Sequence, residues 1–267
     1  MSSSIEFISM SSGSAGNCYF FRINGISFLI DAGVGARVLK KRLNEYGKSI
    51  EEIKFILITH SHIDHIRHLG SIADRYSIPV YSSEIIHNSL INNFCTSGRI
   101  IPHRRVIEKE RLTDISGIKI TCFEVPHDSE ENLGYFIESE KNNITIITDL
   151  GRVTDNVIKY CQKSESVVIE SNYDHYMLEN GRYPDYLISR IKGGNGHLSN
   201  EETASAIKSF YHTGLKNIFL CHLSHNNNTP ELAYETSSKS LSELGVKVGV
   251  EINLHCLPRR DHQRYEI

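Results

Sequence analysis

Short runs of apolar residues alternate with polar, turn-forming segments along much of the chain. In the first part they predict strands at Ile5–Ser9, Cys18–Ile23, Ser27–Asp31, Phe55–Thr59 and Pro79–Ser82. Asn24-Gly25 is a typical hairpin turn between the second and third of these strands. Helical periodicity follows at Ala36–Tyr46, and again from the histidine-rich segment after Thr59 to about Tyr76.

The second part of the chain repeats this alternation with longer helices. Strands are expected at Ile118–Val125, Gly134–Ser139, Asn143–Thr148, Ser166–Glu170, Asn217–Cys221 and Val248–Leu254. Helices are expected at Pro184–Lys192, Asn200–His212 and Pro230–Leu244, the last two opening with the capping residues Ser199 and Thr229. Adjacent strands with interspersed helices favour two packed sheets with helices outside, although the pattern leaves the topology open.

The composition fits one soluble α/β domain. The chain has 267 residues, 39% of them hydrophobic, and it shows no internal repeat or low-complexity linker. We place one domain at residues 1–256 and a charged C-terminal tail at 257–267. Without a long apolar segment or a signal-peptide pattern at its start, the protein is expected to be cytoplasmic. The six cysteines form no CxxC pair, and most lie in apolar runs, so we expect core thiols.

The segment after the buried run Phe55-Ile56-Leu57-Ile58 concentrates potential metal ligands. It reads Thr59-His60-Ser61-His62-Ile63-Asp64-His65. In extended backbone, residues two apart point to the same face, so His60 and His62 can converge on one ion. The turn into the next helix directs Asp64 and His65 towards a second ion. Imidazole and carboxylate groups suit zinc, manganese or iron. His68, in the same helix, is not included among the ligands.

This HxHxDH segment after a buried strand resembles the metallo-β-lactamase superfamily, whose other motifs follow in order along the chain. The resemblance assigns His127 as a further ligand of the first ion and His222 as the last ligand of the second. It makes Asp149 the carboxylate shared by both ions, and Asp31 the aspartate that supports the metal-binding loop. It implies a four-layer αββα sandwich, an α/β fold, with two divalent ions at one edge of the sheets.

Further blocks narrow the resemblance to the bacterial YycJ/WalJ group, whose members are linked to DNA exonuclease activity. These blocks are Ser11 to Asn17, Glu170 to Asp174, Gly181 to Pro184, Gly196 to Glu201, and His222 to Asn228. Glu170 and His197 also resemble a pair in the tRNA 3′-processing endonucleases of the superfamily. In those enzymes the glutamate orients a histidine that assists departure of the leaving group.

These observations predict a two-metal phosphodiesterase, a DNA exonuclease whose nucleophile is a hydroxide between two zinc or manganese ions. His197, oriented by Glu170, is expected to protonate the leaving alkoxide, and Asp64 to help hold the ions. Candidate substrate contacts are Arg182, Ser224, Asn227 and Asn228. We expect DNA in preference to RNA, because the chain shows no insertion of the size found in the multi-domain RNA-cleaving relatives.

Three alternatives stay open at this point. A thioesterase or small-ester hydrolase of the glyoxalase II kind would use the same metals with less need of a proton donor. An RNA-processing nuclease would use the same catalytic groups. A metal-dependent binding protein ranks last, because all seven expected ligand positions are filled.

Overall fold

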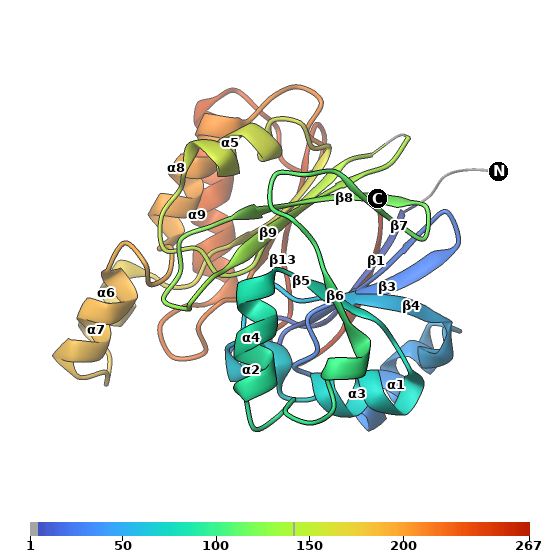
Figure 1. Cartoon of the computed structure of the whole chain (residues 1–267). Coiled ribbons are helices and arrows are strands. Elements are labelled where there is room, and N and C mark those ends of the chain that lie inside the picture. The colour runs from blue at the N-terminus through green and yellow to red at the C-terminus, as the bar shows by residue number, and fades with distance from the viewer. Residues whose placement is uncertain (1–4, 141) are drawn as a thin grey trace.

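The apolar strand segments assemble into two sheets that face each other (Figure 1). In the computed structural model, which describes residues 5–140 and 142–267, each sheet has seven strands. The first sheet, in spatial order, contains β14 (Gln263–Glu266), β1 (Ile5–Ser11), β2 (Cys18–Ile23), β3 (Ile26–Ile30), β4 (Ile53–Leu57), β5 (Val80–Ser82) and β6 (Arg104–Val106). The second contains β13 (Asn253–Cys256), β12 (Asn217–Cys221), β11 (Ser166–Glu170), β10 (Ile144–Ile147), β9 (Leu133–Glu138), β8 (Ile118–Glu124) and β7 (Thr113–Ile115).

A row of phenyl rings crosses the inner face of the first sheet. Phe7, Phe21, Phe28 and Phe55 occupy paired positions on β1 to β4, and successive ring centroids are 4.7, 5.5 and 4.7 Å apart. Phe219, on β12 of the opposite sheet, meets Phe7 edge to face at 5.1 Å. All five rings are fully buried, so they form a continuous apolar layer between the sheets.

Helices cover the outer faces of both sheets (Figure 1). Those beside the first sheet are α1 (Ala36–Glu45), α2 (Ile63–Ile66), α3 (Leu69–Tyr76) and α4 (Glu84–Asn92). Those outside the second are α5 (Asp155–Cys161), α8 (Asn200–Phe210) and α9 (Pro230–Glu243), whereas α6 (His175–Glu179) and α7 (Asp185–Lys192) project from the body. Short 3-10 turns span Ile50–Glu52 and Ile101–His103. The result is the αββα sandwich that we expected, in one domain.

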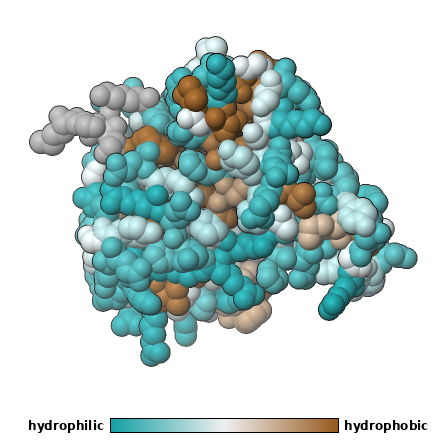
Figure 2. All heavy atoms as spheres, turned by 180° about the vertical axis from the view of Figure 1, so that it is seen from behind, coloured by the Kyte–Doolittle hydropathy of each residue, from teal (hydrophilic) through white to brown (hydrophobic). Residues whose placement is uncertain are grey.

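The outer face is mostly polar and most of the cysteines are buried, as expected for a sandwich with an apolar core. The face turned to the viewer in Figure 2 is mostly polar, with hydrophobic residues in separate patches. Among the described residues, no helix has the length and apolar character needed to cross a membrane. All six cysteines are free thiols, and Cys18, Cys122, Cys161 and Cys221 are buried, which confirms their expected place in the core.

Three expectations differ from the structure. The helix expected to run on to Tyr76 is two helices, because His68 leaves helical geometry and its backbone N–H donates to the carbonyl of Ala32. The strand expected at Val248–Leu254 begins only at Asn253, since Gly249 adopts a left-handed φ of 81° within a turn. The segment 257–267, which we separated as a tail, contributes β14, which pairs with β1 and so belongs to the first sheet.

The parallel strands in the middle of each sheet deliver the site residues. β3 and β4 are parallel neighbours in the first sheet, and β10, β11 and β12 are parallel neighbours in the second. Asp31 and His60 follow the carboxyl ends of the first pair, and Asp149, Glu170 and His222 lie at the carboxyl ends of the second group. The two sheets therefore bring these side chains to one edge of the sandwich, where ligands of open parallel sheets bind.

Candidate metal centre

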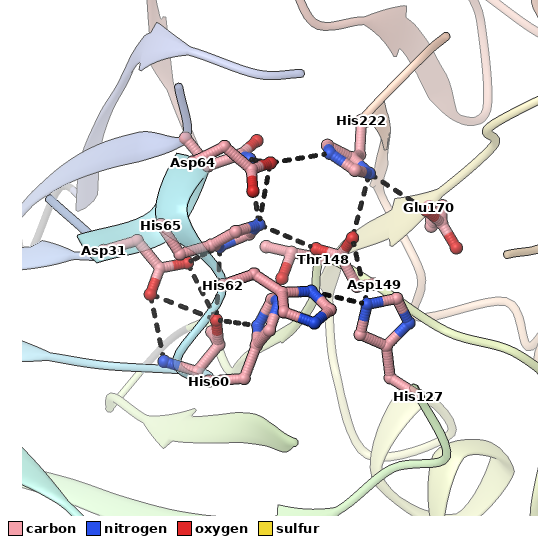
Figure 3. Close-up of polar contacts among 12 residues, drawn as sticks. Asp31, His60, His62, Asp64, His65, His127, Thr148, Asp149, Glu170 and His222 are labelled. Carbon is pink, nitrogen blue, oxygen red and sulfur yellow. Dashed lines mark hydrogen bonds and ion pairs between the residues drawn. The ribbon is translucent and has the colours of Figure 1, made fainter. Parts of the chain in front are cut away.

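Asp31 anchors the histidine-rich loop. One of its carboxylate oxygens accepts hydrogen bonds from the backbone N–H and the hydroxyl of Thr59, both at 3.0 Å. Its other oxygen accepts from Nδ1 of His65 at 2.7 Å. Asp31 itself has a φ of 60°, and it is fully buried. These bonds fix the tautomer of His65, so that Nε2 is directed into the site (Figure 3).

The first group of potential ligands consists of His60, His62 and His127, whose ring nitrogens lie within 4.8 Å of one another. Nδ1 of His127 donates to the carbonyl of Gly196 at 2.9 Å, which leaves Nε2 facing Nδ1 of His62 at 3.2 Å. Nδ1 of His60 lies 3.0 Å from the Thr59 hydroxyl, which already donates to Asp31, so His60 is the donor in that contact. The unprotonated Nε2 of His60 is therefore free to bind an ion.

The second group contains Asp64, His65 and His222. Nε2 of His65 lies 3.5 Å and Nε2 of His222 lies 3.4 Å from the same carboxylate oxygen of Asp64. Asp149 stands between the two groups, with one oxygen 3.0 Å from His65 Nε2 and the other 3.8 Å from His127 Nε2 (Figure 3). This is the position from which a single carboxylate can reach ions in both groups.

The loop that carries these ligands passes close to the strand connections beside it. A Cβ atom at Gly33 would lie 1.8 Å from the carbonyl oxygen of Asp64, so only glycine allows this approach. Asn17, next to it, donates from Nδ2 to the Asp64 carboxylate at 3.0 Å and lies 2.9 Å from His65 Nε2. Sequence reasoning noted the block that ends at Asn17 but gave this side chain no role.

Glu170 and His197 form a hydrogen-bonded pair beside the ligands. His197 Nδ1 donates to one Glu170 oxygen at 2.7 Å, and the other oxygen accepts from the backbone N–H groups of Leu150 and Leu198 at 2.9 and 3.1 Å. Glu170 is fully buried, whereas the His197 side chain is 19% exposed. His222 Nδ1 also lies 3.1 Å from Glu170. The carboxylate therefore fixes the imidazole of His197 at the margin of the site.

Burial and neighbouring charges shift the pKa values in opposite directions across the site. Burial, followed by the other histidines, lowers the pKa of His60 well below its usual range, so its imidazole stays neutral. Burial alone would lower the pKa of His65 and His222 as well. However, Asp31 and Asp149 raise the pKa of His65, and Asp149, Asp64 and Glu170 raise that of His222 to about 10. The site therefore attracts positive charge.

The donor atoms fit metal ions. Within the described residues, Nε2 of His60 is fully buried without a hydrogen-bond partner, which is costly unless it binds a cation. Nε2 of His65 and an oxygen of Asp149 are 3.0 Å apart, and either a proton or a metal ion between them satisfies both atoms. Neutral imidazoles with carboxylates form the donor set of zinc and manganese sites. His60, His65 and Asp149 also lie within 4.8 Å of one another, and this third group connects the first two, so together they suit two neighbouring ions.

The four expected substrate contacts lie in different surroundings. Arg182 is exposed on the projecting segment, and Ser224 lies just past His222 at the surface of a groove. Asn227 is buried, and its backbone N–H donates to the Ser224 hydroxyl. Asn228 is buried too, and its amide nitrogen donates to the carbonyls of Ser171 and Asn172. The Asn228 side chain is thus used within the fold.

Asp128 is a residue near the ligands that sequence reasoning missed. One of its oxygens lies 3.3 Å from His127 Nε2 and 3.8 Å from His62 Nε2, and its other oxygen accepts from Arg190 on α7. Its position directly after His127 is the only signal that the sequence offered.

Comparison with known proteins agrees with this geometry. The model of the beta-lactamase superfamily domain matches residues 27–222, a range that ends at His222. The chain therefore belongs to the metallo-β-lactamase superfamily, and it is a metal-dependent hydrolase of that fold.

Within this superfamily, the chain is similar to several individual proteins. Exodeoxyribonuclease YycJ of Bacillus anthracis is 33% identical over 254 residues, which cover 94% of each chain. Exodeoxyribonuclease WalJ of Streptococcus pneumoniae serotype 2 (strain D39) is 30% identical over 246 residues, covering 92% of this chain and 91% of the relative. In the solved structures, the metallo-β-lactamase fold protein YhfI of Bacillus subtilis has a TM-score of 0.73 at 15% identity, covering 99% of this chain and all of its own. The two exodeoxyribonucleases confirm the expected likeness to the YycJ/WalJ group, and the YhfI structure agrees with the fold.

Proposed function

We propose that the protein is a two-metal phosphodiesterase that removes nucleotides from the ends of DNA. The observation that supports this most is the pairing of His197 with the buried Glu170 at the margin of the metal-binding groups. The leaving group of a phosphodiester is an alkoxide, which needs a proton to depart. The leaving group of a thioester is a thiolate, which departs without one. A positioned imidazole is therefore useful for the first reaction and dispensable for the second.

The metal-binding residues are assigned in two sets with one shared member. His60, His62 and His127 would hold one ion, and Asp64, His65 and His222 the other, with Asp149 shared between them. Zinc or manganese ions bound there would polarise a phosphate oxygen and lower the pKa of water.

The remaining side chains orient these groups and move a proton. Asp31 holds His65 and the Thr59 backbone, so the histidine nitrogens keep their directions before substrate binds. His197 donates the proton to the departing oxygen from the nitrogen that is not bonded to Glu170, and Glu170 balances the charge on the ring. Arg182 and Ser224 are the proposed contacts to phosphate or sugar oxygens, and the buried Asn228 has a structural role.

The relatives support DNA as the substrate, because the YycJ and WalJ proteins are named exodeoxyribonucleases. To test the proposal, the metal-loaded protein is incubated with end-labelled DNA, end-labelled RNA and a thioester panel, with and without chelator. We expect stepwise shortening of the DNA, loss of this activity with chelator, and recovery on adding zinc or manganese. Intact DNA alongside rapid thioester hydrolysis would refute the proposal in favour of the glyoxalase II kind of enzyme.

A further inference from the structure

Two sides of the metal centre carry opposite charge. A groove of about 540 Å³ beside His127 is lined by the carboxylates of Glu124, Glu130, Glu131 and Asp155. Arg152 is the cationic side chain among the residues that line it. Lys109 pairs with Glu124 and Glu131, both at 2.6 Å. The four carboxylates still outnumber Lys109 and Arg152, so a polyanionic strand is repelled along this groove.

The groove beside His222 is positively charged instead. It has a volume of about 590 Å³ and includes Leu223 and Ser224, which directly follow the metal-binding residue His222. Arg259 and Arg260 line it, and of the described residues that form its walls none is an aspartate or glutamate. The Arg259 guanidinium is held in place by donating to the carbonyls of Leu223 and Asn228. This groove attracts phosphates.

Another groove adjoins the one that contains Arg259 and Arg260, and it follows the projecting segment. Its volume is about 550 Å³, and Tyr176 and Arg182 line it, again with no acidic side chain among the described residues of its walls. Tyr183 and Asn226 belong to both grooves, and the Asn226 amide donates to the Tyr183 hydroxyl at 3.1 Å. The two arginine-lined grooves therefore meet at this pair of residues.

Residues 173–196, which we call the arm, contain α6 and α7, which project from the body (Figure 1). The chain enters the arm just after Glu170 and ends it just before His197, the two partners of the catalytic pair. A small core of Tyr173, Leu178 and Ile191 holds the arm together. Its backbone is also tied to the site loop, since the N–H of Asp174 donates to the carbonyl of Asn227 at 2.8 Å.

Two aromatic rings on this arm face solvent. Tyr176 is 74% exposed and Tyr186 is 76% exposed, although large aromatic side chains are usually more buried. Tyr176 lines the groove that contains Arg182, and Tyr186 lies on α7 of the same arm. Proteins hold single-stranded nucleic acid by stacking bases on aromatic rings and placing phosphates on cations.

We infer that the substrate strand leaves the metal centre past Ser224, runs through the arginine-lined grooves, and stacks its bases on the tyrosines of the arm. The occupant is single-stranded DNA, and this rests on the proposed nuclease function. The acidic groove beside His127 shares no lining residue with the two grooves of this path. Tyr176, Tyr186 and Arg182 of the arm thus bind DNA beyond the scissile phosphate and take no part in the chemical step.

The test measures binding and hydrolysis separately. Binding is measured by fluorescence anisotropy of the metal-loaded protein with a labelled oligothymidylate of about twelve nucleotides, whose terminal linkages are hydrolysis-resistant phosphorothioates. The double variant Tyr176→Ala/Tyr186→Ala should weaken this binding about 30-fold or more, since the loss of each base stack costs roughly 5-fold or more. Tyr176→Phe/Tyr186→Phe should restore it, because phenylalanine keeps the stacking surface.

Two further variants separate charge from general surface effects. Arg182→Gln should reduce the slope of log K against log salt concentration by about 0.7, the value for one phosphate contact on a single strand. Phe94→Ala removes another exposed aromatic ring, 83% exposed and outside the arm, and should leave binding unchanged. The tyrosine variants and Phe94→Ala should hydrolyse bis-p-nitrophenyl phosphate at the wild-type rate, because this small diester does not reach the arm.

The outcomes distinguish the arm from the nuclease proposal. Wild-type binding to oligothymidylate with unchanged binding by the tyrosine double variant would overturn the inference about the arm. The inference would also be overturned if Phe94→Ala lost as much affinity for oligothymidylate as the tyrosine double variant. Tighter binding of a uridine oligonucleotide than of oligothymidylate of the same length would overturn it too. Failure of the wild-type protein to shorten DNA, despite tyrosine-dependent binding, would contradict the nuclease function and leave the DNA path supported.

Discussion

Nδ1 of His197 donates a 2.7 Å hydrogen bond to Oε1 of the fully buried Glu170. The second oxygen of Glu170 is held by the N–H groups of Leu150 and Leu198, so the carboxylate cannot turn away from the imidazole. These contacts link β11 to the segment that re-enters the body from the arm. The imidazole of His197, which we propose as the proton donor, is thereby held next to the candidate metal ligands.

Replacing Asp31 with asparagine should weaken metal binding without unfolding the protein. Asparagine tolerates the left-handed backbone that Asp31 adopts, but its amide lacks the negative charge that orients His65. We expect metal affinity to fall about 10- to 100-fold, the usual effect of losing such a supporting contact. Competition with a chelating dye measures this affinity, and circular dichroism checks the fold. An affinity equal to that of the wild type would show that Asp31 does not act through His65.

Asp64→Ala should lower the metal content towards one ion per chain and abolish most phosphodiesterase activity. Its carboxylate contacts both His65 and His222, so its loss leaves the second group with only part of its ligands. Plasma emission spectrometry of the purified protein measures the metal content. Asp74→Ala is the matched control, because Asp74 is an exposed aspartate on the next helix. Full turnover by the Asp64 variant with saturating manganese would contradict the two-metal assignment.

His87 should make stability depend on pH away from the metal centre. It is buried on α4, its Nε2 donates to the carbonyl of Arg105, and burial lowers its pKa below the ordinary value of 6.5. Above pH 6.5 both folded and unfolded states hold neutral His87; below it only the unfolded state gains the proton, so the folded state loses relative stability. This loss amounts to at most about 1.4 kcal/mol per pH unit.

Urea unfolding of the wild type and of His87→Gln between pH 5 and 7.5 tests this dependence. Metal loss at low pH affects both proteins alike, so the difference between their free energies of unfolding isolates His87. The wild type should lose stability relative to the variant as the pH falls below 6.5. Parallel curves would mean that His87 takes up its proton in the folded state.

The sequence predicted the clustering of the candidate metal ligands better than it predicted the surroundings of the site. His60, His62, Asp64 and His65 are adjacent in the chain and follow a continuously apolar strand, so their convergence depends on local geometry alone. Asn17 reaches Asp64 from 47 residues away, and only the packing of two strand connections reveals it. The arginine-lined grooves likewise combine residues from the arm, the loop after His222 and the C-terminal segment, and no spacing rule connects these segments.

Elements at the edges of the sheets were also difficult to predict from the sequence. The short strands β6 and β7 and the helix α4 carry mixed polar and apolar residues, so the periodicity did not predict them. The central strands β2, β11 and β12, by contrast, have the predicted bounds, because they are apolar along nearly their whole length. Strands that are apolar along their whole length can be predicted from the sequence. Elements of mixed composition form through contacts with their neighbours, and the sequence pattern does not show those contacts.

The central claim is that this metal centre hydrolyses phosphodiesters with His197 as the proton donor. The most direct measurement compares His197→Ala with the wild type on DNA and on bis-p-nitrophenyl phosphate, whose phenolate departs without a proton. The variant should lose about 10²- to 10⁴-fold in DNA hydrolysis, with much less loss on the phenolate diester and unchanged metal content. Glu170→Gln should show the same selectivity more weakly. Equal slowing on both substrates, or on neither, would contradict the account.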